Sequence, residues 1–325
     1  MINFMGKTLD NPLIASSCIA TENVESVLRL ARNGVQGAIL KSCADYVRGS
    51  FVGKREFASD EKGFTYASSP FEMEIMTLGE EIALLRELRA QTDILLIPSL
   101  TASTLDVNDW LPQCLRLASE GADGIQLDFF YMGNLIGQEH FADNLTALLG
   151  ELVKSVPCPV MPKLNVNLPK DFIMPLLRKS GVEYVSLLDS VRSPYLKRTA
   201  NGFRLSRRLD ARTTSCFGGW QLPLTLGYAL TAAEHGLRVC AGGGVTCADD
   251  VSKLLAVGTE TVQSATFLTH SPEKAGELIP DGKTGVPSGT DVQDEDTPVF
   301  CMYFFNISSL LYLSQMIMLF RDSFS

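Results

Sequence analysis

The chain has 325 residues, of which 46% are hydrophobic and 20% are charged, a balance typical of a globular protein with a sizeable core. Its formal net charge of −9, with no basic tract to offset it, argues against a nucleic-acid partner. The eight cysteines include no C-x-x-C pair and the three histidines are far apart, so we expect no metal site and reduced thiols in a cytoplasmic protein.

Short apolar runs recur along the first 268 residues, and we predict that each is a β-strand. In chain order the predicted strands are Pro12–Ser16, Gly37–Lys41, Ile94–Leu100, Gly124–Phe129, Val160–Leu164, Tyr184–Leu188, Arg238–Ala241 and Thr261–Ser264.

Amphipathic stretches separate these runs and predict helices over Val24–Asn33, Glu80–Ala90, Asp109–Glu120, Leu145–Ser155, Asp171–Ser180, Pro223–His235 and Ala248–Ala256. Several of them end in a glycine, at Gly34, Gly121, Gly181 and Gly236, which is a helix C-cap signal. Eight strands alternating with helices favour an α/β fold of the (β/α)8 TIM-barrel type with long loops at the C-terminal face. A doubly wound open sheet is the alternative.

Two connections between strand and helix are too long for simple turns. They run over residues 42–79 and 189–222, and both are rich in charged side chains. Long loops at the C-terminal face of a barrel usually cover a ligand, which is the interpretation we favour. Solvated charged excursions are the alternative.

Glycines follow the seventh predicted strand in the run Ala241-Gly-Gly-Gly-Val245, and the eighth strand continues as Val262-Gln-Ser-Ala-Thr-Phe-Leu268. Backbone amides at glycines can approach an anion closely, and TIM barrels bind phosphate after strands seven and eight. The pair of loops therefore predicts a phosphate-bearing ligand, although plain turns also use glycine. Lys163 follows the apolar run Pro159–Pro162 and is predicted to point into the barrel mouth rather than to extend along its rim.

The C-terminal part has a different composition. We predict a barrel over residues 1–278, a polar linker over 279–298 and an apolar tail over 299–325. Residues 299–320 are long enough to span a bilayer, but polar residues dilute them, so membrane attachment is expected only if this tail is an anchor. The alternatives are a final helix packed on the barrel or a sequence changed by a splice or gene-model error.

Seven short motifs in chain order resemble those of the dihydroorotate dehydrogenase-like flavoproteins, which are FMN-binding TIM barrels. They are Asn11-Pro-Leu-Ile-Ala-Ser-Ser17, Lys41-Ser42, Met161-Pro-Lys-Leu164, Leu188-Asp-Ser190, Cys216-Phe-Gly-Gly-Trp220, and the two glycine and phosphate loops after strands seven and eight. The resemblance covers about residues 1–275.

The resemblance implies FMN as cofactor, a small-molecule substrate, a role in pyrimidine metabolism and pairing into a homodimer. It places Lys163 near N1 and O2 of the flavin, where a cation stabilises the reduced ring, and Lys41 near flavin and substrate. The implied cofactor-binding residues are Ala15, Ser16, Lys41, Ser42, Asp128, Lys163, Asp189, Ser190, Gly218, Gly219, Gly243, Gly244, Ala265 and Thr266.

The sequence departs from the family where the substrate is deprotonated. The family has a Cys or Ser base after strand four, but this chain reads Asp128-Phe-Phe-Tyr-Met-Gly-Asn134, with Tyr131 in register with the base. A phenol is a better proton donor than base at neutral pH. By register, Ser69 and Asn134 are predicted to contact substrate. Asp128 and Asp189 either accept hydrogen bonds from substrate or ribityl chain, or cap nearby turns.

Taken together, these residues predict an FMN-dependent oxidoreductase acting on the CH–CH group of a pyrimidine-like or amide-containing substrate, with Tyr131, Lys163 and Lys41 as catalytic residues. Two other functions are compatible with the same loops: a flavin-free, phosphate-binding lyase or synthase, and a barrel that binds FMN without turnover. Cys18, Cys43 and Cys216 are expected on loops facing the ligand, as reactive or as inert thiols.

Overall fold

The structure is a computed structural model that describes residues 1–45, 56–59, 64–68, 75–129, 135–205 and 214–280. Eight parallel strands in this part of the chain close into a barrel, because β3 pairs with both β17 and β4. The strands are β3 (Leu13–Ala15), β4 (Gly37–Ala44), β8 (Leu95–Leu100), β9 (Ile125–Asp128), β10 (Val160–Lys163), β11 (Tyr184–Leu187), β16 (Arg238–Gly242) and β17 (Thr259–Ser264). Each overlaps one of the eight predicted strands.

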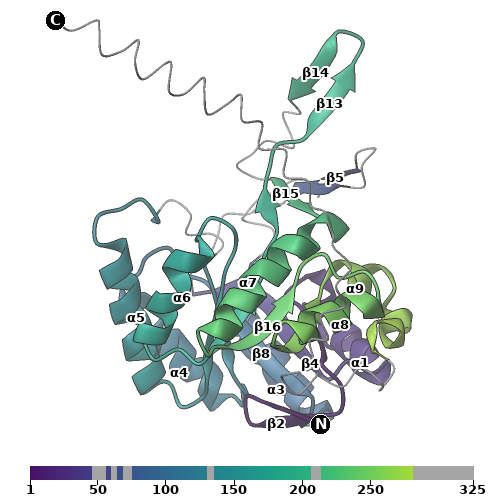
Figure 1. The fold of residues 1–325 in the computed structure, drawn as a ribbon. Helices are drawn as coiled ribbons and strands as arrows, with labels where there is room; N and C mark the ends of the chain where they lie inside the picture. Colours follow the sequence, from purple (N-terminus) through teal and green to yellow (C-terminus); the bar gives the residue numbers. More distant parts are fainter. Residues whose placement is uncertain (46–55, 60–63, 69–74, 130–134, 206–213, 281–325) are drawn as a thin grey trace, which may run out of the picture. The chain divides into compact units, whose positions relative to one another are not determined.

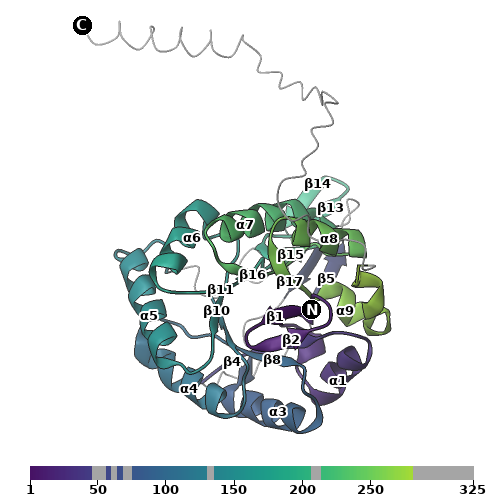
Figure 2. The same ribbon diagram turned by 60° about the horizontal axis from the view of Figure 1, so that its bottom comes forward.

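A ring of helices surrounds the barrel, as Figures 1 and 2 show. The helices are α1 (Val24–Arg32), α3 (Leu78–Gln91), α4 (Leu111–Ser119), α5 (Phe141–Ser155), α6 (Lys170–Lys179), α7 (Leu222–Glu234), α8 (Ala248–Ala256) and α9 (Thr266–His270). Short 3-10 helices lie at η1 (Ile19–Thr21), η2 (Val107–Asp109), η4 (Gly219–Gln221) and η5 (Pro272–Leu278). The fold is therefore a (β/α)8 TIM barrel, as predicted.

The glycines predicted to end helices have the left-handed backbone that this role requires. The φ angles of Gly34, Gly121, Gly181 and Gly236 are 94°, 93°, 79° and 69°. Helix α3 begins with a capping box in which Thr77 and Glu80 exchange hydrogen bonds, which explains a start two residues before the predicted one.

An N-terminal hairpin that the sequence did not predict closes the lower end of the barrel. Its strands are β1 (Ile2–Phe4) and β2 (Lys7–Leu9), joined through Met5 and Gly6, both of which have positive φ. Phe4, Met5 and Leu9 are buried in one apolar cluster with inward barrel side chains such as Ile39 and Met161. Figure 2 shows the hairpin lying across the barrel end.

The two long connections contain strands that pair with each other, a feature the sequence did not reveal. β5 (Glu56–Ser59) and β6 (Thr65–Ser68) come from the first connection, and β12 (Val191–Arg192) and β15 (Thr214–Phe217) come from the second. They form an antiparallel sheet in the order β12-β15-β6-β5. The second connection also holds a hairpin of β13 (Leu196–Thr199) and β14 (Gly202–Leu205), and the short β7 (Met76–Thr77) pairs with β4.

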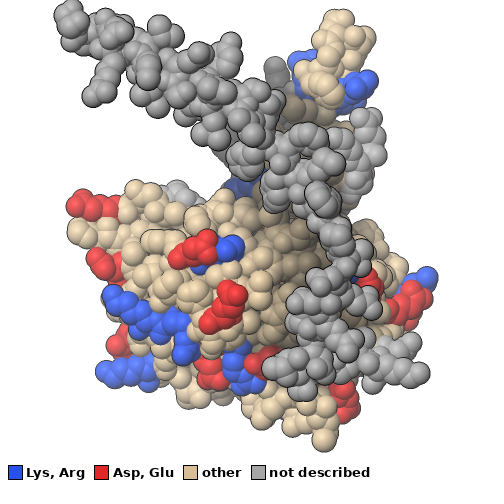
Figure 3. Space-filling view, viewed as in Figure 1, with Lys and Arg blue, Asp and Glu red and all other residues tan. Residues whose placement is uncertain are grey.

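On the face in Figure 3, basic and acidic side chains are interspersed over the flank of the barrel. None of the helices in the described ranges has the length and apolar character needed to cross a bilayer. The predicted tail 299–325 and all but the first two residues of the predicted linker lie outside the described residues.

Candidate functional site

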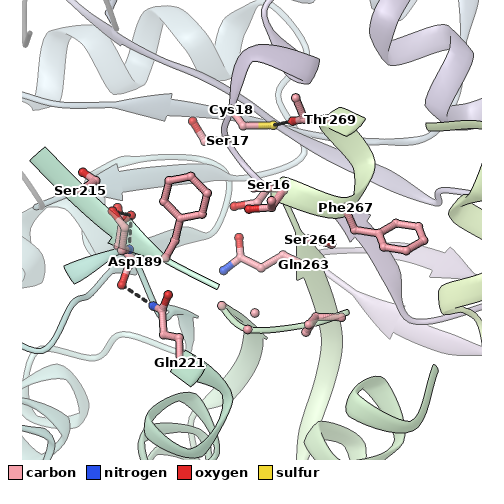
Figure 4. A pocket seen from close by; sticks show the side chains of 18 of the residues that line it. Ser16, Ser17, Cys18, Asp189, Ser215, Gln221, Gln263, Ser264, Phe267 and Thr269 are labelled. Atoms are coloured by element: carbon pink, nitrogen blue, oxygen red, sulfur yellow. Dashed lines mark hydrogen bonds between the residues drawn. The ribbon is translucent and has the colours of Figure 1, made fainter. Parts of the chain in front are cut away.

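A cavity of about 450 Å³ opens at the carboxyl ends of the barrel strands. Its walls come from residues in the carboxyl-terminal parts of β4, β9, β10, β16 and β17, from residues just after β3, β11, β16 and β17, and from the segment before α7. Figure 4 shows side chains from several of these elements converging on one space. In TIM barrels this face holds the functional site, because eight strand ends deliver side chains to it from distant parts of the sequence.

Most of the predicted cofactor-binding residues line this cavity. They are Ser16, Lys41, Ser42, Asp128, Lys163, Asp189, Ser190, Gly218, Gly219, Gly243, Gly244, Ala265 and Thr266. Ala15 does not line it. Its side chain is fully buried and packs in the core shared with the outer helices, because alternate residues of β3 face opposite sides of the sheet.

Three predicted residues cannot be compared with this cavity. Tyr131, the predicted proton-transfer residue, and Ser69 and Asn134, the predicted substrate contacts, lie outside the described residues. Their roles stay predictions.

Lys163 and Asp189 form an ion pair in the cavity wall. The Nζ of Lys163 lies 2.7 Å from Oδ2 of Asp189, and the side chains are 9% and 17% exposed. Burial lowers the pKa of Lys163, but the nearby carboxylates of Asp189 and Asp128 outweigh burial and raise it above its ordinary value. The ammonium is therefore charged at neutral pH. Asp189 is a partner of the lysine, a role that the sequence did not predict.

The second aspartate of the cavity is held by a directed chain of hydroxyls. Ser42 Oγ donates to Asp128 Oδ2 over 2.8 Å, and Ser42 Oγ lies 3.1 Å from Ser99 Oγ. Because Ser42 has one proton and gives it to the carboxylate, Ser99 must donate to Ser42. Ser99 Oγ in turn accepts from Gln126 Nε2 over 2.9 Å. This buried chain fixes the rotamer of Ser42 and gives Asp128 a stable donor.

Lys41 lines the cavity beside a β-bulge in β4. The register with β8 shifts between Ile39 and Ser42, and the Lys41 side chain is 8% exposed. Behind it, on α3, Glu81 is fully buried, and in the part of the chain that the structure describes neither of its carboxylate oxygens has a hydrogen-bond partner within normal distance. Burial raises the pKa of Glu81 well above its ordinary value, and the Ser99 backbone and the Lys41 charge offset only part of this.

The three cysteines expected to face the ligand are in different places. Cys18 lines the cavity, with its Sγ 3.5 Å from Thr269 Oγ1. Cys43 is fully buried in the core between barrel and helices, and burial, with Glu81 nearby, raises its pKa well above the ordinary value. Cys216 is buried in β15 and is not among the residues of the cavity wall. The expected position was wrong for Cys216 and for Cys43, because the bulge in β4 places Lys41 and Ser42, rather than Cys43, at the cavity.

The glycine run after β16 shapes one wall of the cavity. Gly243 and Gly244 have φ angles of 98° and 91°, and a Cβ on Gly244 would lie 2.3 Å from the backbone nitrogen of Leu222 in α7. Packing against α7 therefore requires glycine here, whatever ligand binds. In the described residues, no backbone or side-chain acceptor pairs with the N–H groups of Gly243, Gly244, Ala265 or Thr266. These amides are available to an anion.

Sequence reasoning missed two glutamines of the cavity. Gln221 donates through Nε2 to the backbone oxygens of Leu188 and Asp189 and so fixes the turn that carries Asp189. Gln263 projects from β17 and is 3% exposed. A glutamine in a strand predicted to line the barrel was the available signal for Gln263. The aromatic rings of Phe217 and Phe267 also line the cavity.

Neither a scan against models of protein families nor a search of curated proteins found a match for this chain.

Proposed function

We propose that this barrel is an FMN-dependent oxidoreductase, similar to the dihydroorotate dehydrogenase-like flavoproteins. It moves a hydride between flavin and the CH–CH group of a small pyrimidine-like or amide-containing substrate. The observation that carries the proposal is a single cavity lined both by unpaired backbone amides on two neighbouring loops and by a buried, protonated lysine.

The cavity fits FMN in its chemistry. The amides of Gly243, Gly244, Ala265 and Thr266 would hold the phosphate, since adjacent N–H groups without partners form an anion site. The rings of Phe217 and Phe267 offer apolar surface to a planar ring system. A volume of about 450 Å³ is within the range of about 300–1,000 Å³ typical of cofactor and ligand pockets.

When bound, FMN supplies a hydride acceptor and donor at N5. The protein would supply the charge. Lys163 is kept protonated by Asp189 and Asp128, so it offers a fixed positive charge to electron density that develops on a neighbouring ring. Because the ion pair is already formed, little reorganisation is needed during the reaction. The proton on the substrate side is assigned to Tyr131, as predicted from the sequence.

The charge balance of the cavity supports a neutral substrate. Among the described residues of its wall, Lys41 and Lys163 contribute two positive charges and Asp128 and Asp189 two negative charges, so these formal charges cancel. The Lys163 ammonium is already paired with the carboxylate of Asp189, whose Oδ2 lies 2.7 Å from Nζ. A substrate carboxylate would have to compete with this carboxylate, whereas a neutral amide would not. We therefore expect uracil-type rings to bind better than their carboxylated analogues.

The test is cofactor binding by the purified protein. We expect a yellow preparation whose released chromophore is FMN, or a colourless one that takes up added FMN and binds it much more tightly than riboflavin, which has no phosphate. A protein that neither carries nor takes up FMN contradicts the proposal. Binding of sugar phosphates without flavin would then favour the flavin-free lyase or synthase.

Turnover is tested on the FMN-loaded protein. After anaerobic photoreduction, a suitable unsaturated substrate should reoxidise the flavin, with uracil more effective than orotate at equal concentration. Flavin that no compound of this class reoxidises, in a protein that binds FMN well, would favour the barrel without turnover.

A further inference from the structure

Gln263 contributes a buried side-chain amide to the cavity. Its Nε2 donates to Ser186 Oγ over 2.9 Å and to the backbone oxygen of Leu187 over 2.8 Å. Figure 4 shows the amide end of Gln263 pointing toward the middle of the cavity, with Ser16 and Gln221 among the side chains around it. Its other atom, Oε1, is buried and has no hydrogen-bond partner among the described residues.

The orientation of this amide is fixed by its partners. A backbone carbonyl can only accept a hydrogen bond, so the atom facing the oxygen of Leu187 must be the nitrogen of Gln263. Turning the amide over would put two acceptor oxygens against each other. The carbonyl oxygen of Gln263 is therefore held on the other side, away from Leu187, by contacts inside the protein.

A buried acceptor without a donor is costly, because folding removes its hydrogen bonds to water and returns none. The strands could carry an apolar residue at this position at less cost, as at Ile39 and Met161, which also face the barrel interior. The retained acceptor fits a ligand that brings its own donor. Phe217 lines the same cavity and offers apolar surface to a flat ligand.

We propose that Oε1 of Gln263 accepts a hydrogen bond from the ring N–H of an imide or lactam, so that the cavity selects heterocycles whose ring nitrogen is unsubstituted. This inference rests on the proposed function, in which both the flavin and a pyrimidine-like substrate carry such an N–H. Gln263 is thus a binding residue that reads one edge of the heterocycle.

The experiment compares ligands that differ by one methyl group. FMN and its N3-methyl derivative are titrated into the protein, with binding followed by flavin fluorescence. On the FMN-loaded protein, uracil is compared with 1-methyluracil and 3-methyluracil by the change in flavin absorbance. We expect an approximately tenfold preference for the unmethylated ligand in at least one of these two series, which is the worth of one ordinary hydrogen bond.

Two variants test whether Gln263 is the source of the preference for the unmethylated ligand. Gln263→Leu should reduce the preference to near one in the series that shows it. Gln113→Leu is the control: Gln113 is also a buried glutamine, but it lies on α4 and is not part of the cavity wall, so the preference should survive. Loss in the FMN series identifies the flavin as the source of the N–H, and loss in the uracil series identifies the substrate.

The outcomes separate the two proposals. FMN uptake with no preference in either series, or a preference unchanged in Gln263→Leu, overturns the role of Gln263 and leaves the flavin assignment standing. Failure of the wild-type protein to take up FMN overturns both. Because the methylated ligands are tested on the wild-type protein, an absence of preference overturns the role of Gln263 whether or not Gln263→Leu folds.

Discussion

At the scale of single residues, the cavity depends on charges that neutralise each other. Lys163 comes from β10 and Asp189 from the turn after β11, and their ion pair offsets the cost of holding both charges away from water. Sequence reasoning selected both residues for the site, but it did not predict their contact, because the pairing depends on how the ends of two adjacent strands are aligned. Gln221, which holds the Asp189 turn, was missed for the same reason.

Replacing Lys163 with Met should destabilise the fold by about 3–5 kcal/mol, because the carboxylate of Asp189 stays buried without its partner. The double variant Lys163→Met/Asp189→Leu should recover most of this loss. Chemical unfolding at neutral pH measures both values. Equal stability of the single variant and the wild type would show that the ion pair contributes nothing. Variants at Lys163 should also retain FMN less well.

The pH dependence of this loss follows from the raised pKa of Lys163. A lysine whose pKa is higher in the folded state than its ordinary 10.5 contributes its full stabilisation below 10.5 and loses it as the pH rises through the folded value. The difference between wild type and Lys163→Met should therefore be constant from about pH 6 to about pH 9 and should shrink only in stronger alkali.

At the scale of elements, the barrel strands were predictable and the rim was not. Strands such as β8 and β10 are continuous apolar runs, since both faces are covered, and such runs stand out in sequence. β6 and β15 are four-residue strands whose pairing partner is about 150 residues away. Nothing in their composition specifies that partner, so the two connections were predicted as loops over a ligand and not as one sheet.

The loop after β16 should tolerate no side chain at Gly244. We expect Gly244→Ala to lower the free energy of unfolding by at least about 2 kcal/mol, because of the positive φ and the contact with Leu222 in α7. Gly227, inside α7, is the control: a Cβ there meets nothing within 4 Å, so Gly227→Ala should stabilise the protein by up to about 1 kcal/mol. Thermal unfolding compares the two variants. A Gly244→Ala variant as stable as the wild type would contradict the packing.

At the scale of the whole molecule, the barrel carries its own closing elements. The last of them is η5, whose Ala275 and Leu278 are fully buried, and Ile279 packs against the same core. The sequence placed the end of the barrel at residue 278 from its change in composition, which is a property that can be read without knowing any contact.

A chain that ends after Pro280 should therefore unfold at nearly the same temperature as the full-length chain. One that ends after His270 should lose several kcal/mol, since a buried leucine alone is worth about 2–5 kcal/mol. Differential scanning calorimetry distinguishes these cases. Marked destabilisation of the chain ending at Pro280 would show that residues 281–325 belong to the packed fold.

The N-terminal hairpin determines from which side small molecules can reach the cavity. With Phe4, Met5 and Leu9 filling the base of the barrel, small molecules have no passage along its axis and must arrive from the side of the strand ends. If the barrel is a flavoenzyme as proposed, the reductant and the oxidant must reach the flavin through the same opening of the cavity. We expect them to take turns, each leaving before the next can enter, which is the kinetic pattern known as ping-pong.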